Sequence, residues 1–456
     1  MIFGRRNNTN LSRSDCDWKK TYSMKKTAKN DLEEGFQKFC ALHKAGRYPE
    51  AEKGYRKILQ NTPDSLQVLR ALGNLYLDQN RVKKAKPVFE KAAGFDPPDV
   101  FSCYQLGRLK QLENDHQGAI PLYRRMLEVA PEAGLAWNNL GVAYRETGAQ
   151  EDAMASFQEA VRFAPGLAAA WNNLGVALDE NNQADKALTA YQKAIDMDPA
   201  YASPHLNLGI LLQKAGRFKA AEPHYRKVLE TQPKNEIAQF MLQTISAGDN
   251  PPDAAPVAHV RRIFDQCADN FEAVLVDELA YQTPERLFHL VRPYLTENMD
   301  ILDLGCGTGL GAVLYQPFAK CLTGVDVSEK MLEKAAGKNI YTRLEVFDIL
   351  EKWTFPIKFD LIYSCDVLVY FGTLDPIVKS AAASLALGGK FAFSVERLKD
   401  DDIPYRLYPS GRYAHSIKYT LACLDRHGLK LLKINNTTIR KQAGQPVKGL
   451  LIVAEK

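Results

Sequence analysis

Three residue types recur every 34 residues through the first half of the chain. Glycine takes one position of the repeat, at Gly73, Gly107, Gly141, Gly175 and Gly209. Alanine and proline keep the same period, at Ala51, Ala85, Ala119, Ala153, Ala187 and Ala221, and at Pro63, Pro97, Pro131, Pro165, Pro199 and Pro233. A period of this length, held over five or six copies, is typical of stacked structural repeats and not of one globular core.

Each copy predicts two helices joined by a turn. The glycine lets the two helices approach closely, the alanine lies where they cross, and the proline ends the second helix because it cannot continue the hydrogen-bond ladder. The clearest copy, "LAWNNLGVAYRETGAQEDAMASFQEAVRFAP" at 135–165, resembles a tetratricopeptide (TPR) repeat. We expect six repeats and a capping helix over residues 32–246.

The net positive charge of the chain lies in its first thirty residues. They carry eight Lys or Arg and two Asp or Glu, whereas the whole chain has a net charge of +5, so the remaining residues have a net charge of −1. We expect residues 1–31 to be a disordered basic tail, and no nucleic-acid partner, since such proteins usually carry a basic folded face. The sequence has no apolar run that suits a membrane span, and its scattered cysteines predict reduced thiols, no metal site and a cytoplasmic location.

A row of side-chain amides accompanies the repeat. Gln105, Asn139, Asn173 and Asn207 all lie two residues before a repeat glycine. An amide both donates and accepts, so it can match any peptide group. The row resembles the asparagine ladder of O-linked N-acetylglucosamine transferases, which implies a protein or peptide partner on the concave face. Alternatively, these amides satisfy local backbone groups or face water.

The proline-rich stretch "DNPPDAAPVA" lies in a predicted linker, residues 247–258, and the pattern changes after it. Over 259–456, seven predicted strands alternate with helices, near 299–304, 321–325, 344–346, 359–363, 390–395, 429–435 and 449–454. The fold class is therefore two-domain, an all-α superhelix followed by an α/β domain with a mostly parallel, Rossmann-like sheet. Ligands of such sheets bind at the carboxyl ends of the strands.

A glycine loop follows the first of these strands. "DILDLGCGTG" places Asp303 before Gly305, Gly307 and Gly309, with Cys306 between the glycines. A dinucleotide fingerprint that starts at Gly305 would need a third glycine where Leu310 stands. The stretch resembles motif I of class I S-adenosylmethionine (SAM) methyltransferases. That resemblance implies a donor lying against bare backbone, with Asp303 near its cationic groups.

Acids also end the next two strands. Asp326 can accept hydrogen bonds from both hydroxyls of a ribose. By the same resemblance, Asp348 takes the adenine amino group and Ser364 borders the methionine part of the donor. Val327, Met331 and Ile349 would then enclose the ring. The expected cofactor is SAM, with S-adenosylhomocysteine as product and without a metal.

The acceptor side has four candidate residues, Asp366, Tyr370, Tyr413 and His415. His415 could remove a proton from the acceptor, or it could cap the helix that starts at Ser416. An amphipathic helix carrying Phe264, Asp265, Phe271 and Tyr281 would cover the donor, as in related enzymes, or simply pack on the sheet. The motifs that methylate adenine or glutamine amino groups, and cytosine C5, are missing.

Two further stretches narrow the resemblance. "VRRIFDQCADNFEAVLVDELAY" and "YRLYPSGRYAHSIKY" resemble a bacterial family of class I SAM-dependent methyltransferases with N-terminal TPR repeats, over residues 32–456. We expect methyl transfer to a protein or carrier-bound acceptor recruited by the repeats. Two alternatives stay open: a small-molecule methyltransferase whose repeats serve assembly, and a non-catalytic interaction scaffold that senses SAM.

Overall fold

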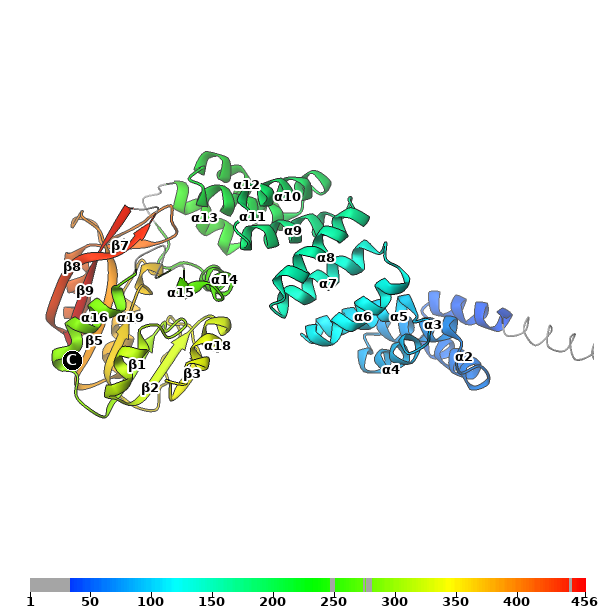
Figure 1. The fold of residues 1–456 in the computed structure, drawn as a ribbon, viewed down its shortest axis with the longest axis horizontal. Helices are drawn as coiled ribbons and strands as arrows, with labels where there is room; N and C mark the ends of the chain where they lie inside the picture. Colours follow the sequence, from blue (N-terminus) through cyan, green and yellow to red (C-terminus); the bar gives the residue numbers. More distant parts are fainter. Residues whose placement is uncertain (1–32, 247–250, 274, 276–280, 443–444) are drawn as a thin grey trace, which may run out of the picture. The chain divides into compact units, whose positions relative to one another are not determined.

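The computed structural model describes residues 33–246, 251–273, 275, 281–442 and 445–456. Its contacts divide the chain into two compact units, Met1–Leu178 with Asp196–Asp198, and Asp179–Ile195 with Pro199–Lys456 (Figure 1). The described part of the first unit consists of helices and turns, and the second unit holds the last repeat helices and an α/β sheet. The predicted tail, residues 1–31, lies outside the described residues, and the domain boundary at 247–258 stays a prediction.

The predicted helical hairpins are confirmed. Residues 33–44 are helical. The following repeat helices are α2 (Tyr48–Asn61), α3 (Leu66–Asp78), α4 (Val82–Ala93), α5 (Val100–Leu112), α6 (His116–Val129), α7 (Gly134–Glu146), α8 (Gln150–Phe163), α9 (Ala168–Glu180), α10 (Ala184–Met197), α11 (Ala202–Lys214), α12 (Phe218–Thr231) and α13 (Glu236–Ser246).

The repeat glycine lies under an aromatic ring of the next helix. A Cβ atom on Gly141 of α7 would lie 2.6 Å from the ring of Phe157 in α8, which is completely buried. The same arrangement holds for the pairs Gly73 and Phe89, Gly107 and Tyr123, and Gly209 and Tyr225. The glycine is thus required because a ring occupies the space of its missing side chain.

The first repeat differs at the glycine position. Phe39 stands where the later repeats have glycine, and its ring lies over Gly54 of α2. Tyr55, the next residue, keeps the aromatic position of the repeat and meets the Phe39 ring edge-on at 6.4 Å. The missing side chain of Gly54 therefore leaves room for the Phe39 ring in the atypical first copy.

The repeat prolines also bind the next helix. The indole Nε1 of Trp137 donates to the carbonyl of Pro131 at 2.7 Å, and Trp171 donates to Pro165 at 2.8 Å. Proline ends one helix, and its carbonyl oxygen then accepts a hydrogen bond from the side chain six residues later. The period of 34 residues therefore repeats a polar contact as well as an apolar one.

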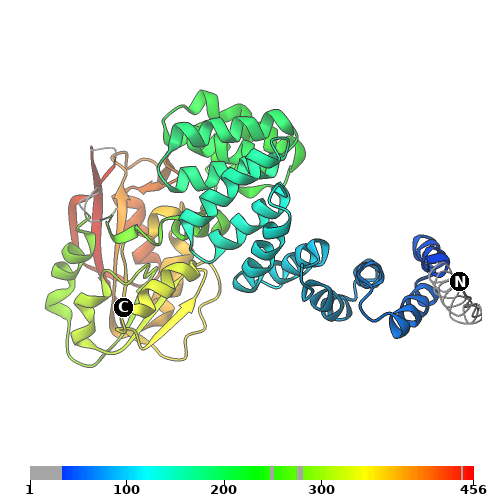
Figure 2. The same ribbon diagram turned by 45° about the vertical axis from the view of Figure 1, so that its right-hand side comes forward.

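The second unit is built on a nine-stranded sheet, shown from two sides in Figures 1 and 2. Its order is β3-β2-β1-β4-β5-β7-β6, with β9 antiparallel to β5 and to β8. The strands are β1 (Met299–Leu304), β2 (Ala319–Asp326), β3 (Arg343–Val346), β4 (Phe359–Ser364), β5 (Leu385–Arg397), β6 (Tyr405–Leu407), β7 (Tyr413–His415), β8 (Lys430–Gln442) and β9 (Gln445–Glu455). All seven predicted strands are present, and the short pair β6 and β7 was not predicted.

Parallel pairing brings the strand ends together. β1 pairs with β2 and with β4, so that Asp303 lies opposite Gly324 on one side and Tyr363 on the other. Below these ends lies a core that includes Ile301, Leu361 and Val453. The carboxyl ends of β1, β2 and β4 therefore form one edge, where a ligand site is expected.

The helices of this unit are α14 (Val257–Cys267), α15 (Phe271–Ala273), α16 (Thr283–Val291), α17 (Ala312–Tyr315), α18 (Glu329–Gly337), α19 (Asp375–Ser384) and α20 (Ile417–Arg426), with 3-10 turns η2 (Arg292–Tyr294), η3 (Gln316–Phe318) and η4 (Leu368–Tyr370). The expected single helix carrying Phe264 and Phe271 is interrupted after Cys267. Among the described residues, no helix has the length and apolar character needed to cross a bilayer.

We predict that Gly141→Ala lowers the free energy of unfolding by about 1–3 kcal/mol, because the added methyl group displaces the Phe157 ring. Gly166→Ala is the matched control, since a Cβ atom there meets nothing within 4 Å. The measurement is urea denaturation of the full chain followed by far-UV circular dichroism. Equal midpoints for the two variants would contradict the proposed role of the glycine.

Candidate functional site

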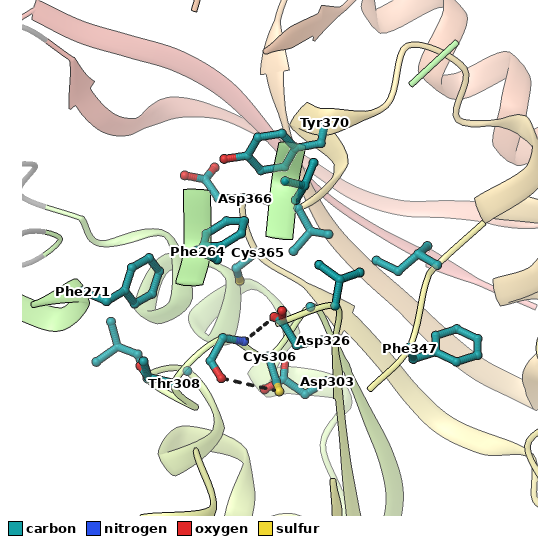
Figure 3. A pocket seen from close by; sticks show the side chains of 18 of the residues that line it. Phe264, Phe271, Asp303, Cys306, Thr308, Asp326, Phe347, Cys365, Asp366 and Tyr370 are labelled. Atoms are coloured by element: carbon teal, nitrogen blue, oxygen red, sulfur yellow. Dashed lines mark hydrogen bonds between the residues drawn. The ribbon is translucent and has the colours of Figure 1, made fainter. Parts of the chain in front are cut away.

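Four acids from successive strand ends line one pocket. Asp303 ends β1, Asp326 ends β2, and Asp348 and Asp366 follow β3 and β4. Figure 3 shows Asp303 and Asp326 on one side of this pocket and Asp366 with Tyr370 on the other. The other predicted cofactor residues that line it are Gly305, Cys306, Gly307, Val327 and Ile349.

The glycine loop is pinned to β2. The backbone nitrogens of Gly305 and Cys306 both donate to the carbonyl of Val325, at 2.8 and 2.9 Å. Gly305 has a φ of +76°, and a Cβ atom on it would lie 2.3 Å from Val367. Only glycine satisfies both conditions, so the loop presents bare backbone to the pocket.

Asp326 is held by backbone donors. Its Oδ2 accepts from the nitrogen of Gly307 at 2.9 Å, and its Oδ1 accepts from the nitrogen of Ser328 at 3.0 Å. Burial raises the pKa of this carboxyl group. Because each carboxylate oxygen can accept about two hydrogen bonds, both oxygens keep capacity for a ligand hydroxyl. The group therefore fits a vicinal diol such as that of a ribose.

Asp303 lies deeper in the pocket. The hydroxyl of Tyr341 donates to its Oδ2 at 2.7 Å. Burial raises the pKa of Asp303 to about 7, since an ionised carboxylate is poorly solvated there. A bound cation would favour the ionised form. Tyr341 was not predicted, because it lies in the connection between α18 and β3 and no motif marks it.

Two phenylalanines form the opposite wall. The rings of Phe264 in α14 and Phe271 in α15 lie 5.9 Å apart, and Phe264 meets Tyr370 edge-on at 5.7 Å (Figure 3). Tyr281 also lines the pocket. This supports the predicted apolar cover.

Side-chain hydrogen bonds tie this cover to the loops beneath it. The hydroxyl of Thr308 donates to Glu272 at 2.6 Å, and the hydroxyl of Ser328 donates to Asp265 at 2.6 Å. Thr308 belongs to the glycine loop, and Ser328 follows β2. The cover is thus connected to the same two loops that hold Asp326. Sequence reasoning missed Glu272 because its partner is 36 residues away.

Asp366 has an unusual environment. Its φ is +58°, its backbone nitrogen donates to Ser394 at 2.8 Å, and its Oδ2 accepts from Arg440 Nη1 at 3.0 Å. Oδ1 is buried without a hydrogen-bond partner among the described residues. Arg440 itself is buried and also binds Glu396. This side of the pocket therefore holds a carboxylate whose position is fixed by a buried cation.

Three predicted cofactor residues do not line the pocket. The nitrogen of Gly309 donates to the carbonyl of Cys306 and closes the loop. Met331 is fully buried in α18, and the hydroxyl of Ser364 donates to the carbonyl of Leu304 at 2.8 Å, which joins β4 to β1. All three support the residues that do line the pocket.

His415 and Tyr413 lie in β7 and do not line the pocket either. His415 is completely buried, its Nε2 donates to the carbonyl of Phe371 at 2.8 Å, and burial lowers its pKa to about 4. The hydroxyl of Tyr413 donates to the carbonyl of Pro252 at 2.8 Å. The geometry separates both side chains from the acids of the pocket.

The two cysteines of the pocket are poor nucleophiles. Burial raises the pKa of Cys306 and of Cys365 well above the ordinary value of a thiol. Since the thiolate is the reactive form, neither is activated at neutral pH. Among the described residues, no three His, Cys, Asp or Glu side chains are grouped to hold a metal ion.

The amides of the predicted ladder bind neighbouring side chains. Within the first unit, Asn139 donates to the hydroxyl of Tyr104 at 3.4 Å, and Asn173 donates to Asn138 at 2.9 Å. Gln105 accepts from Arg108. In the second unit, Asn207 accepts from Arg262 of α14 at 2.8 Å.

Family models match both halves of the chain. A methyltransferase domain matches residues 301–389. Tetratricopeptide repeat models match residues 36–100, 104–168, 180–216 and 206–232. The two matches fall on the α/β sheet and on the helical hairpins.

Curated relatives match over parts of their length. A ubiquinone biosynthesis O-methyltransferase from Coxiella burnetii is 29% identical over 117 residues, which are 24% of this chain and 49% of the relative. A ribosomal protein L11 methyltransferase from Thermosipho melanesiensis is 35% identical over 88 residues, 18% of this chain and 33% of the relative. The chain thus spans half or less of these curated relatives.

Among solved structures, an N-methyltransferase from Bradyrhizobium japonicum with bound S-adenosylhomocysteine is 19% identical, with a TM-score of 0.37 over 43% of this chain and 97% of that chain. The TPR protein YrrB is 19% identical, with a TM-score of 0.36 over 41% of this chain and 95% of that chain. From its family models and its own fold, the chain consists of tetratricopeptide repeats followed by a class I methyltransferase domain.

Proposed function

We propose that this protein transfers a methyl group from SAM to a protein or carrier-bound acceptor that its repeats recruit. One observation carries the proposal: the glycine loop and the acids of three successive strand ends line a single pocket, with Asp366 and Tyr370 facing them. SAM, when bound, supplies an electrophilic methyl group on a cationic sulfur. The remaining chemistry falls to residues of the chain.

The donor side would hold the two ends of SAM by different means. Asp326 accepts from the ribose hydroxyls, and Asp348 accepts from the adenine amino group. The loop at Gly305 and Gly307 admits the amino-acid part against backbone, and Asp303 offsets its positive charge. The two backbone donors that fix Asp326 keep its oxygens oriented before the donor arrives.

The acceptor side would orient the nucleophile. Asp366 lines the pocket with its carboxylate fixed by Arg440, so the carboxylate can accept a hydrogen bond from an N–H or O–H of the acceptor. Tyr370 lies beside it, and the rings of Phe264 and Phe271 keep water away from the reacting atoms. Orientation can supply much of the acceleration when the leaving group is already good.

The repeats would raise the local concentration of an acceptor. The amides of Asn139 and Asn173 are partly exposed, and each can take another hydrogen bond beyond the contact described above. A small-molecule acceptor is the second candidate, because one matching relative is named for ubiquinone biosynthesis.

We predict that Asp326→Ala weakens SAM and S-adenosylhomocysteine to a similar degree, because both share the ribose. Loss of hydrogen bonds to a charged acceptor costs about 1.5–3 kcal/mol, which is roughly 10- to 150-fold in Kd. Isothermal titration calorimetry provides the measurement, with the exposed Asp425→Ala as control. No binding by the unmodified protein at millimolar SAM would refute the proposed function.

We predict that SAM affinity falls as the pH drops below about 7. Asp303 is protonated there, and the cationic donor binds best to the ionised carboxylate, so the loss approaches tenfold per pH unit for one proton. Calorimetry from pH 5.5 to 8 measures this slope. Asp303→Asn should bind SAM weakly at every pH with a flatter profile; an unchanged slope in this variant would assign the titration to another group.

The acceptor class can be tested with methyl-tritiated SAM. We predict that the full chain labels macromolecules in a cell extract, that Asp326→Ala does not, and that Asn139→Ala with Asn173→Ala reduces labelling without changing SAM affinity. Label confined to small molecules would favour the second candidate. SAM binding without any label would favour the non-catalytic scaffold.

A further inference from the structure

A second, larger cavity lies in the same unit as the pocket. It is a groove of about 1160 Å³, compared with about 140 Å³ for the pocket between the strand ends. One wall comes from β5 to β9 and their connections, and the other from α11, α13 and α14. The two walls meet where Gln213 of α11 donates to the carbonyl of Pro409 at 2.8 Å.

The groove concentrates positive charge. Eight of its lining residues are cationic and only Glu396 and Asp400 are acidic, a net of +6; the cations are Lys214, Arg397, Lys399, Arg406, Arg412, Arg440, Lys441 and Lys448. The whole chain is +5, and its first thirty residues alone contribute +6. Residues outside both the groove and the first thirty residues therefore have a net charge of −7, so the basic lining is a local feature.

Part of this charge has no partner. Arg440 binds Asp366 and Glu396, and Arg406 lies 3.9 Å from Asp400. In the part of the chain that the structure describes, no carboxylate lies within ion-pair distance of four other lining cations, Arg397, Lys399, Arg412 and Lys441. The Nε of Arg397 is moreover buried without a hydrogen-bond acceptor among the described residues. A buried donor of this kind is costly unless a ligand supplies the acceptor.

The groove reaches the acceptor side of the pocket. Tyr370 and Arg412 line both cavities, and the Arg412 guanidinium lies 5.9 Å from the centre of the Tyr370 ring. Arg440 lines the groove and binds Asp366, which lines the pocket. A ligand in the groove would therefore extend toward the side of the pocket that Asp366 lines.

We propose that the groove binds an acidic peptide segment of the methyl acceptor, whose carboxylates pair with Arg397, Lys399, Arg412 and Lys441. That this peptide belongs to the methyl acceptor rests on the proposed function, whereas binding of the peptide to the groove can be measured without it. The volume exceeds that of typical small-ligand pockets, about 300–1000 Å³, which favours a chain segment. Helices α11 and α13 of the last repeats also form one wall, so an acceptor bound to these two helices would lie along this surface.

The test uses the full chain and a fluorescein-labelled, glutamate-rich peptide followed by fluorescence anisotropy. The matched probe replaces every glutamate by glutamine. We expect the acidic peptide to bind at least tenfold more tightly, and its affinity to fall with rising salt. Lys399→Gln with Lys441→Gln, both exposed, should weaken binding about tenfold. Lys330→Gln with Lys352→Gln removes the same charge from exposed positions outside the groove and should have no effect.

The outcomes separate the groove from the donor site. SAM affinity, measured by calorimetry on the same variants, should be unchanged. Equal binding of the acidic and neutral peptides would overturn the groove proposal and leave the proposed function standing. Tighter binding of inorganic pyrophosphate or of a short RNA than of the acidic peptide would also overturn it. Absence of SAM binding would refute the proposed function, and the anisotropy would still decide the groove.

Discussion

The carbonyl oxygen of Val325 fixes the glycine loop that lines the pocket. It accepts from the nitrogens of Gly305 and Cys306, and so fixes the loop after β1 against the end of β2. Asp326, the next residue on that strand, accepts a hydrogen bond from the nitrogen of Gly307. Parallel pairing aligns β1 with β2 and β4. These hydrogen bonds therefore fix the positions of the glycine loop, Asp303 and Asp326 relative to one another.

The helical half depends on a different kind of complementarity. A ring from one helix of a hairpin occupies the space that a glycine leaves free on the other helix. In the first repeat Phe39 replaces that glycine, and Gly54 of the second helix leaves the space for its ring. Both residues of each contact lie in the same repeat, so the contact recurs with the period of 34 residues and can be recognised in the sequence.

Residues close to a local motif could be predicted, and residues that arrive from distant strands could not. Asp303, Asp326 and Asp348 each lie at or just after the carboxyl end of a strand, and the alternation of strands with helices predicts a parallel sheet with these ends at one edge. Arg440 comes from β8, 74 residues after Asp366, and no local pattern predicts that pairing. Three other candidates, Met331, Ser364 and His415, are completely buried and do not line the pocket, because burial of a side chain near a motif depends on packing that the motif does not specify.

Helix α14 serves two surfaces at once. Phe264 lines the donor pocket, Arg262 binds Asn207 of the last repeat, and His259 packs against Phe240 of α13 at 5.5 Å. Two binding events that share this helix are coupled reciprocally. If binding of the donor stabilises the packing of α14 against α11, then a ligand that holds α11 and α14 together raises the affinity for the donor by the same factor. Recruitment of the acceptor and binding of the cofactor would then be two coupled steps, each of which raises the affinity for the other ligand.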